Sequence, residues 1–157
     1  MSLKYEVLLS GQRKKVIFFG SLDETVRGTL NGLHQVDGLD ILFNFKYLEN
    51  INSLGIRNWI LFIKQFSVDR KIIFEECPFH LVNVLNMHPS FRGGGEISSF
   101  YGDFVCEGCN EDIPKLFTVS EGIEKIEEEI RNAKCPNCGE SMVLSEFEDA
   151  FLSFLTE

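Results

Sequence analysis

Four cysteines in the C-terminal half of the sequence form two pairs with the spacing of metal ligands. Cys106 and Cys109 make one C-x2-C pair, Cys135 and Cys138 make the other, and 25 residues separate them. The two-residue gap lets both sulfurs of a pair turn toward one point, and a glycine within or directly after each pair permits the tight turn. Four thiolates complete the tetrahedral ligand set of a structural Zn²⁺ ion and leave no position for water. The spacing therefore predicts a structural zinc site in a ribbon-like segment.

Other cysteine chemistry is open to the same residues. Two disulfides, a redox-active pair or an iron–sulfur cluster would also use closely spaced cysteines. The chain has five cysteines, an odd number, and its N-terminus shows no signal segment, which favours metal binding in a reducing compartment. Cys77 is the cysteine left over, and it precedes Pro78 at an expected helix start. It is either an activated thiol or, as we favour, a small buried apolar residue.

Charge is distributed unevenly along the chain. Residues 1–95 carry 11 basic and 9 acidic residues, a net charge of +2, whereas residues 96–157 carry 4 basic and 15 acidic residues, a net charge of −11. Because nucleic-acid affinity depends mainly on Lys and Arg neutralising phosphates, the cysteine-bearing half is expected to repel DNA and RNA. No apolar run approaches the roughly 18 residues of a membrane span. We therefore expect a cytoplasmic protein that binds neither nucleic acid nor a membrane.

The N-terminal part alternates short strands with helices. Apolar and β-branched runs predict a hairpin and then two further strands, at residues 4–10, 14–19, 39–45 and 72–74. Three apolar stripes with helical spacing predict three helices. The first is capped by Asp23, the second is capped by Asn52 or Ser53, and the third starts at Cys77-Pro78, where Pro78 suits the first turn. This order predicts an α/β fold in which helices pack on a mixed β-sheet.

A segment of different, more acidic composition begins after Gly93-Gly94-Gly95. The three glycines predict a flexible joint. The Glu-rich stretch between the cysteine pairs is either a helix lined by isoleucines or a solvated face. Further on, Ser145 and Glu148 have the spacing of a capping box, ahead of an amphipathic helix that carries Phe147, Phe151, Phe154 and Leu155. We expect helix 145–157 to cover the N-terminal sheet, which makes residues 96–144 a zinc-ribbon-like insertion in a domain formed by residues 1–92.

Two short motifs resemble those of the STAS family, the sulfate-transporter and anti-sigma-factor-antagonist regulators. Gly20-Ser21-Leu22-Asp23 matches the family's Gly-x-Leu-Asp after the first hairpin. Asn52-Ser53-Leu54-Gly55-Ile56 matches in part the Asp-Ser-Ser/Thr-Gly-Ile/Leu motif that opens the first long helix after a central strand. Asn52 replaces the usual acid and Leu54 replaces the second hydroxyl residue. The resemblance spans residues 4 to about 91 and resumes in the final helix.

The resemblance implies a bacterial regulatory module that binds proteins and catalyses no reaction. In the family, a kinase that is also an anti-sigma factor phosphorylates the serine at the helix start, and the added charge breaks the complex. Carried over to this sequence, Ser53 is the phosphorylation candidate, and Asn52, Ser53 and Gly55 are the candidate partner-binding residues. A simpler role remains open, because Ser53 or Asn52 can act only as a helix cap.

Two other classes of function compete with this one. A zinc-ribbon protein associated with transcription or nucleic-acid machinery is the main alternative, and the acidic charge of the ribbon opposes it. An enzyme that uses Cys77 or a redox cysteine pair is the third. The sequence supplies no base, oxyanion site or cofactor loop for such an enzyme, so we expect the chain not to be one.

Overall fold

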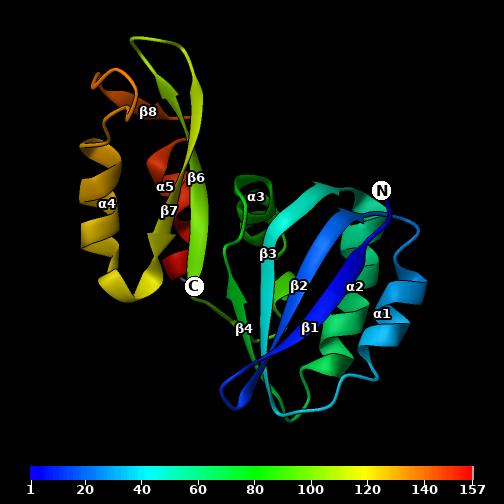
Figure 1. Cartoon of the computed structure of the whole chain (residues 1–157). Coiled ribbons are helices and arrows are strands. Elements are labelled where there is room, and N and C mark those ends of the chain that lie inside the picture. The colour runs from blue at the N-terminus through cyan, green and yellow to red at the C-terminus, as the bar shows by residue number, and fades with distance from the viewer. Residues whose placement is uncertain (157) are drawn as a thin grey trace.

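A five-stranded mixed sheet forms the first half of the computed structural model, which describes residues 1–156 (Figure 1). Its strands lie in sequence order: β1 (Lys4–Ser10), β2 (Arg13–Leu22), β3 (Asp40–Ile51), β4 (Lys71–Glu75) and β5 (Glu96–Ile97). β1 and β2 form an antiparallel hairpin. The strands from β2 to β5 all run parallel to one another. The predicted α/β class with a mixed sheet is therefore confirmed.

Helices α1 (Arg27–Leu33) and α2 (Ser53–Phe66) cover one face of this sheet (Figure 1). The core between them centres on Trp59, which is fully buried. Its ring lies 5.7 Å from that of Phe18 on β2 and 5.4 Å from that of Phe43 on β3. Its indole Nε1 donates to the carbonyl of Phe91 at 2.9 Å, so this large side chain is buried without losing its hydrogen bond.

A three-stranded antiparallel sheet forms the second half of the structure. Its strands, in spatial order, are β7 (Asp112–Thr118), β6 (Ser99–Cys106) and β8 (Met142–Leu144). After the short 3-10 turn η2 (Val119–Glu121), the Glu-rich stretch folds as α4 (Ile123–Arg131), which buries Ile126 and Ile130. The helix interpretation of this stretch is therefore correct, although Ile123 stays 38% exposed.

Helix α3 (Phe79–Met87) lies between the two sheets and contacts both β3 and β6 (Figure 1). The C-terminal elements α5 (Glu148–Phe151) and η3 (Ser153–Thr156) pack on it. Phe151 lies 5.6 Å from Phe79, and its carbonyl accepts a hydrogen bond from Asn86 Nδ2 at 3.0 Å. The end of the chain thus contacts α3 rather than lying on the five-stranded sheet.

Two of the expected helix caps are wrong. Asp23 Oδ1 accepts hydrogen bonds from the N–H and the hydroxyl of Thr25, so it closes a local turn, and α1 begins only at Arg27. The capping box at Ser145 does not form, because the N–H of Ser145 continues the strand pairing and donates to the carbonyl of Asp103. α5 is consequently one turn long, and Phe147 at its start is 83% exposed.

The triple glycine forms a packed turn rather than an open linker. It follows the 3-10 helix η1 (Pro89–Arg92), and Gly93 has a φ of +58° in the left-handed region. A Cβ on Gly93 would lie 2.7 Å from Cγ1 of Ile63, so only glycine lets the chain pass so close to α2. Among residues 1–156, no helix is long and apolar enough to cross a bilayer.

Candidate metal centre and partner-binding surface

The four paired cysteines meet in one cluster, as their spacing predicts. The Sγ atoms of Cys106, Cys109, Cys135 and Cys138 all lie within 4.8 Å of one another. Cys106 and Cys138 are 3.3 Å apart, and Cys109 and Cys135 are 3.8 Å apart. A tetrahedral ion with metal–sulfur bonds of about 2.3 Å needs sulfurs about 3.8 Å apart. The four thiols are free and can therefore hold a metal ion.

Each cysteine pair is part of a tight turn that aims backbone N–H groups at a sulfur. Cys106 ends β6, and the N–H groups of Gly108 and Cys109 point to its Sγ at 3.3 and 3.4 Å. In the second turn, the N–H of Asn137 lies 3.4 Å from Sγ of Cys135. Such donors stabilise thiolates and orient them toward a bound cation. Both turns therefore fit the donor set of a four-thiolate metal site.

The pKa values of the clustered thiols are shifted in opposite directions. The backbone N–H of Cys109 lowers the pKa of Cys106 to about 6, and the thiol of Cys138 adds to this effect. The N–H of Glu111 acts in the same direction on Cys109, but the Cys106 sulfur, burial and the other two thiols raise the pKa of Cys109 to about 12. The Cys106 thiolate therefore forms readily, and the neighbouring sulfurs raise the pKa of Cys109 and of Cys138. A bound cation would neutralise the thiolates and favour their ionisation.

The fifth cysteine takes no part in this cluster. Cys77 precedes α3 in the chain and is fully buried. Burial raises the pKa of its thiol well above the ordinary value. Only the thiolate is a strong nucleophile, so a thiol with a raised pKa in an apolar setting is unreactive. Its position matches the structural role favoured from the sequence.

Residues of the second motif form the start of α2. Asn52 is the N-cap, and its side-chain oxygen accepts the N–H of Gly55 at 2.9 Å. Ser53 is the first helical residue and is exposed. The cap therefore belongs to Asn52, and the Ser53 hydroxyl makes no hydrogen bond within residues 1–156. Ser53 is left free on the surface at the positive end of the helix.

The two motifs that carry the STAS resemblance contact each other directly. The N–H of Asn52 donates to the carbonyl of Leu22 at 3.1 Å, and Asn52 Nδ2 donates to Glu24 at 2.8 Å. Gly55 passes so close to the first motif that a Cβ there would lie 2.0 Å from the oxygen of Leu22. Glycine is required here by backbone contact rather than by φ. The end of β2 thus fixes where α2 begins.

A groove of about 310 Å³ begins beside Ser53 and follows α2. Its lining consists of Ser53, Ile56, Arg57, Ile60, Leu61 and His88. His88 follows α3, so the groove joins the exposed side of α2 to the end of the next helix. Sequence patterns pointed to the start of α2 only. Leu61 is an apolar residue on the otherwise polar side of α2, and it is exposed. This misplaced apolar residue was the sequence signal that could have revealed the rest of the groove.

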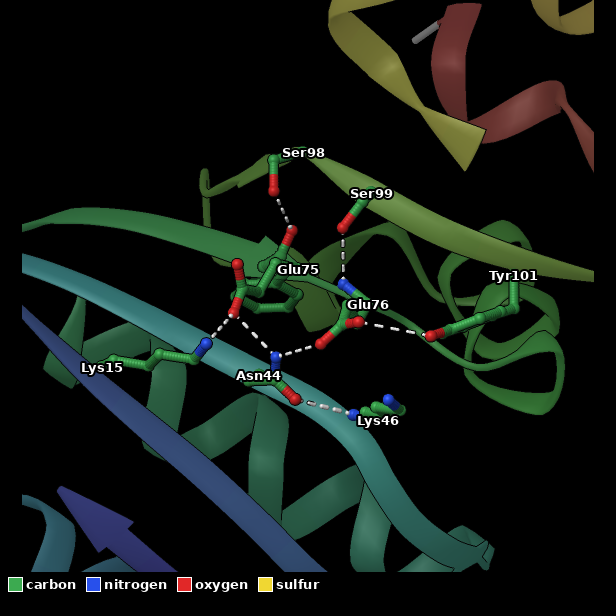
Figure 2. Close-up of polar contacts among 9 residues, drawn as sticks. Lys15, Asn44, Lys46, Glu75, Glu76, Ser98, Ser99 and Tyr101 are labelled. Carbon is green, nitrogen blue, oxygen red and sulfur yellow. Dashed lines mark hydrogen bonds and ion pairs between the residues drawn. The ribbon is translucent and has the colours of Figure 1, made fainter. Parts of the chain in front are cut away.

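A polar cluster that the sequence did not predict joins the two halves of the protein (Figure 2). Asn44 on β3 is 3% exposed, and its Nδ2 donates to Glu75 at 2.7 Å and to Glu76 at 2.6 Å. Tyr101 on β6 donates its hydroxyl to the other oxygen of Glu76 at 3.2 Å. The N–H of Glu76, whose φ is +49°, donates to Oγ of Ser99 at 2.7 Å. Glu76 thus fastens the second sheet to the first, while Glu75 holds Asn44 from the same strand end.

No known family model matches this sequence, and no curated protein matches it significantly.

Replacing Cys135 by Ser should abolish metal binding, because it removes one of four ligands and leaves the other thiols free to protonate. We expect wild-type protein to hold one metal ion per chain in elemental analysis and Cys135→Ser to hold none. Hydrogen exchange should become faster in the two cysteine turns and stay unchanged in β2, β3 and β4. Cys77→Ala, which removes the thiol outside the cluster, should keep the metal. A wild-type protein purified in the presence of metal but holding none would contradict the site.

Replacing Gly55 by Ala should destabilise the protein by about 3 kcal/mol or more, since the new Cβ meets backbone atoms of Leu22 that cannot move aside. Gly28→Ala is the matched control. Gly28 is exposed in α1 with nothing within 4 Å of the added Cβ, so helix propensity should raise stability by up to about 1 kcal/mol. Urea unfolding measures both changes. Equal effects of the two substitutions would refute the close approach.

Proposed function

We propose that the chain is a regulatory module that binds another protein through the start of α2 and releases it when Ser53 is phosphorylated. It is a non-enzymatic partner switch of the STAS type, and its partner is a kinase-like regulator such as an anti-sigma factor. The contact between the two motifs is the observation that carries this proposal. It holds an exposed serine at the start of α2, next to a groove.

The surface around Ser53 has the composition of a protein interface. Leu54 and Leu61 lie two helical turns apart on the exposed side of α2 and are 52% and 57% exposed. Met87, at the end of α3, is 73% exposed. Leu61 lines the groove, and Leu54 and Met87 directly adjoin lining residues along the chain. Exposed apolar side chains at such a place are typical of sites where a partner buries them. These apolar side chains would strengthen binding of the partner. A negative charge added to Ser53, which lies among them, would weaken that binding.

Phosphorylation of Ser53 would change this surface without disturbing the helix. A phosphate in the first turn is stabilised by the helix dipole and by nearby N–H groups. Arg57 lies four residues further along the helix and makes no ion pair with residues 1–156, so it is available to the phosphate. The added charge of about −2 would stand beside apolar side chains that the partner must bury. Phosphorylation would therefore leave the fold intact and break the complex with the partner.

Zinc is the ion that we assign to the cysteine cluster in this proposal. Four thiolates in a tetrahedron suit Zn²⁺, and no ligand position remains for water or a substrate. The ion would therefore have a structural role. It would tie the β6–β7 turn to the turn before β8, in addition to the hydrogen bonds from the N–H of Glu107 to the carbonyl of Ser141 and from Asn137 Nδ2 to Glu111.

Ser53→Asp should imitate the phosphorylated state and weaken the partner complex at least about tenfold, which is about 1.4 kcal/mol. Pulldown from the source cell's lysate with wild-type protein, followed by mass spectrometry, identifies the retained proteins. A kinase-like or sigma-regulating protein should be retained by wild type and lost with Ser53→Asp. Purified, that partner should transfer phosphate from ATP to wild type but not to Ser53→Ala.

Two control variants separate the switch from a general effect of charge. Ser120→Asp adds the same charge to an exposed serine of η2, in the other half of the protein, and should retain the partner. Ser53→Ala removes the hydroxyl without adding charge and should also retain it. Identical retention by wild type and Ser53→Asp would reduce Ser53 to a residue of the helix start and end the proposal.

A further inference from the structure

A second groove, of about 610 Å³, lies in the cysteine-bearing half, on a surface that shares no residue with the one around Ser53. It runs between α4 and the chain that connects β8 to α5. Ile130 and Met142 form its buried floor, each 7% exposed. Phe147 and Val143 stand on its border, 83% and 51% exposed. Phe147 is the most exposed large apolar side chain in the described chain, so this surface leaves an aromatic ring in water.

The border of this groove is acidic. Glu107, Glu146 and Glu148 line it, and Arg131 is the one basic residue among its lining. Arg131 is already engaged, since its guanidinium lies 3.3 Å from Glu127 and 4.0 Å from Glu148. The surrounding half of the chain adds to the negative field, with its net charge of −11. The groove therefore attracts positively charged ligands and repels negatively charged ones.

The carboxylate of Glu148 is only weakly compensated within the chain. Its Oε1 is buried and accepts no hydrogen bond, and the cation that faces it, Arg131 Nε, is 4.0 Å away. The Glu148 side chain is 27% exposed, so a Lys or Arg side chain in the groove can approach its charge and offset it.

We infer that this groove binds a Lys- and Arg-rich segment of a partner protein that also carries a large apolar side chain. The apolar side chain packs between Phe147 and the floor, and the basic side chains meet Glu107, Glu146 and Glu148. This pairing of an apolar anchor with a charged rim is how grooves commonly recognise peptides. The partner site is independent of Ser53, so either surface can fail its test without the other.

Other occupants fit less well. Phosphate-bearing ligands, whether nucleic acids or anionic lipid surfaces, are repelled by the acidic border. A second copy of this chain would have to supply the basic segment, and the three basic residues in succession on β2 are the obvious source. Each of them is already ion-paired within its own chain: Arg13 with Asp40, Lys14 with Asp37 and Lys15 with Glu75. A foreign basic segment therefore satisfies the groove best.

The test uses the full chain, loaded with metal, and a fluorescein-labelled synthetic peptide composed of Lys, Arg, Leu and Trp. Fluorescence anisotropy should show saturable binding that weakens as salt is added. A peptide with Glu in place of Lys and Arg should not bind, and one with Ser in place of Leu and Trp should bind at least about tenfold more weakly.

Three variants locate the binding. Phe147→Ser and Glu146→Lys change the groove and should each weaken the complex about tenfold or more. Neither residue is buried, so both variants should fold. Glu128→Lys makes the same charge change at an exposed position of α4 outside the groove and should leave the affinity within about twofold.

Three results would overturn the inference. One is the absence of peptide binding by wild-type protein at low salt. Another is an equal loss of affinity in Glu128→Lys and Glu146→Lys, because the peptide would then recognise only the overall negative charge. The third comes from sedimentation velocity: a wild-type dimer that becomes a monomer in Phe147→Ser would make a second copy of the chain the occupant.

Discussion

The structure depends on one short stretch of backbone pairing, where the chain beyond β4 meets the beginning of β6. The N–H of Cys77 donates to the carbonyl of Ser99 at 3.2 Å, and the N–H of Tyr101 donates back to Cys77 at 2.8 Å. Glu76 adopts a positive φ of +49° to reach this pairing, which is uncommon for a residue other than glycine. Its N–H bond to Ser99 and its carboxylate contacts offset that cost. These few bonds set the position of the second sheet, and therefore of the cysteine cluster, relative to the first.

Burial explains why a polar cluster can make this joint. Asn44 sits in the middle of a strand whose other central residues are apolar, and an unpaired amide there would be destabilising. Its oxygen accepts the N–H of Lys46 at 3.0 Å, which fixes the orientation of the amide and points Nδ2 at the two glutamates. Lys15 then lies 3.0 Å from Glu75 and offsets part of the negative charge. Every member of the cluster thus limits the positions of the others, which makes the joint specific as well as stable.

The sequence predicted the parts of this protein that are governed by local rules. Helical spacing located α2 and made α4 one of two alternatives, and the paired cysteines located their own cluster, because these patterns act over a few residues. It failed where another hydrogen bond replaced the expected cap. Asp23 accepts from Thr25, two residues away, and so closes a local turn instead of capping a helix. Ser145 pairs with Asp103 on a neighbouring strand, and spacing alone cannot identify this partner because the bond depends on where the strands lie.

The same limit applies to the two grooves. Each is built from residues that look ordinary in the sequence, and what distinguishes them is exposure. Leu61 lies on the exposed side of α2, outside its buried stripe, and Phe147 was expected inside an amphipathic helix that in fact starts one residue later. An apolar side chain left in water costs free energy in the isolated protein. The two proposed sites then differ in kind. Phosphorylation of Ser53, as proposed, would change the charge at the first groove, whereas Glu107, Glu146 and Glu148 give the second a permanent negative charge. A surface of fixed charge suits a partner held continuously, and a surface with one modifiable residue suits a partner that must be released.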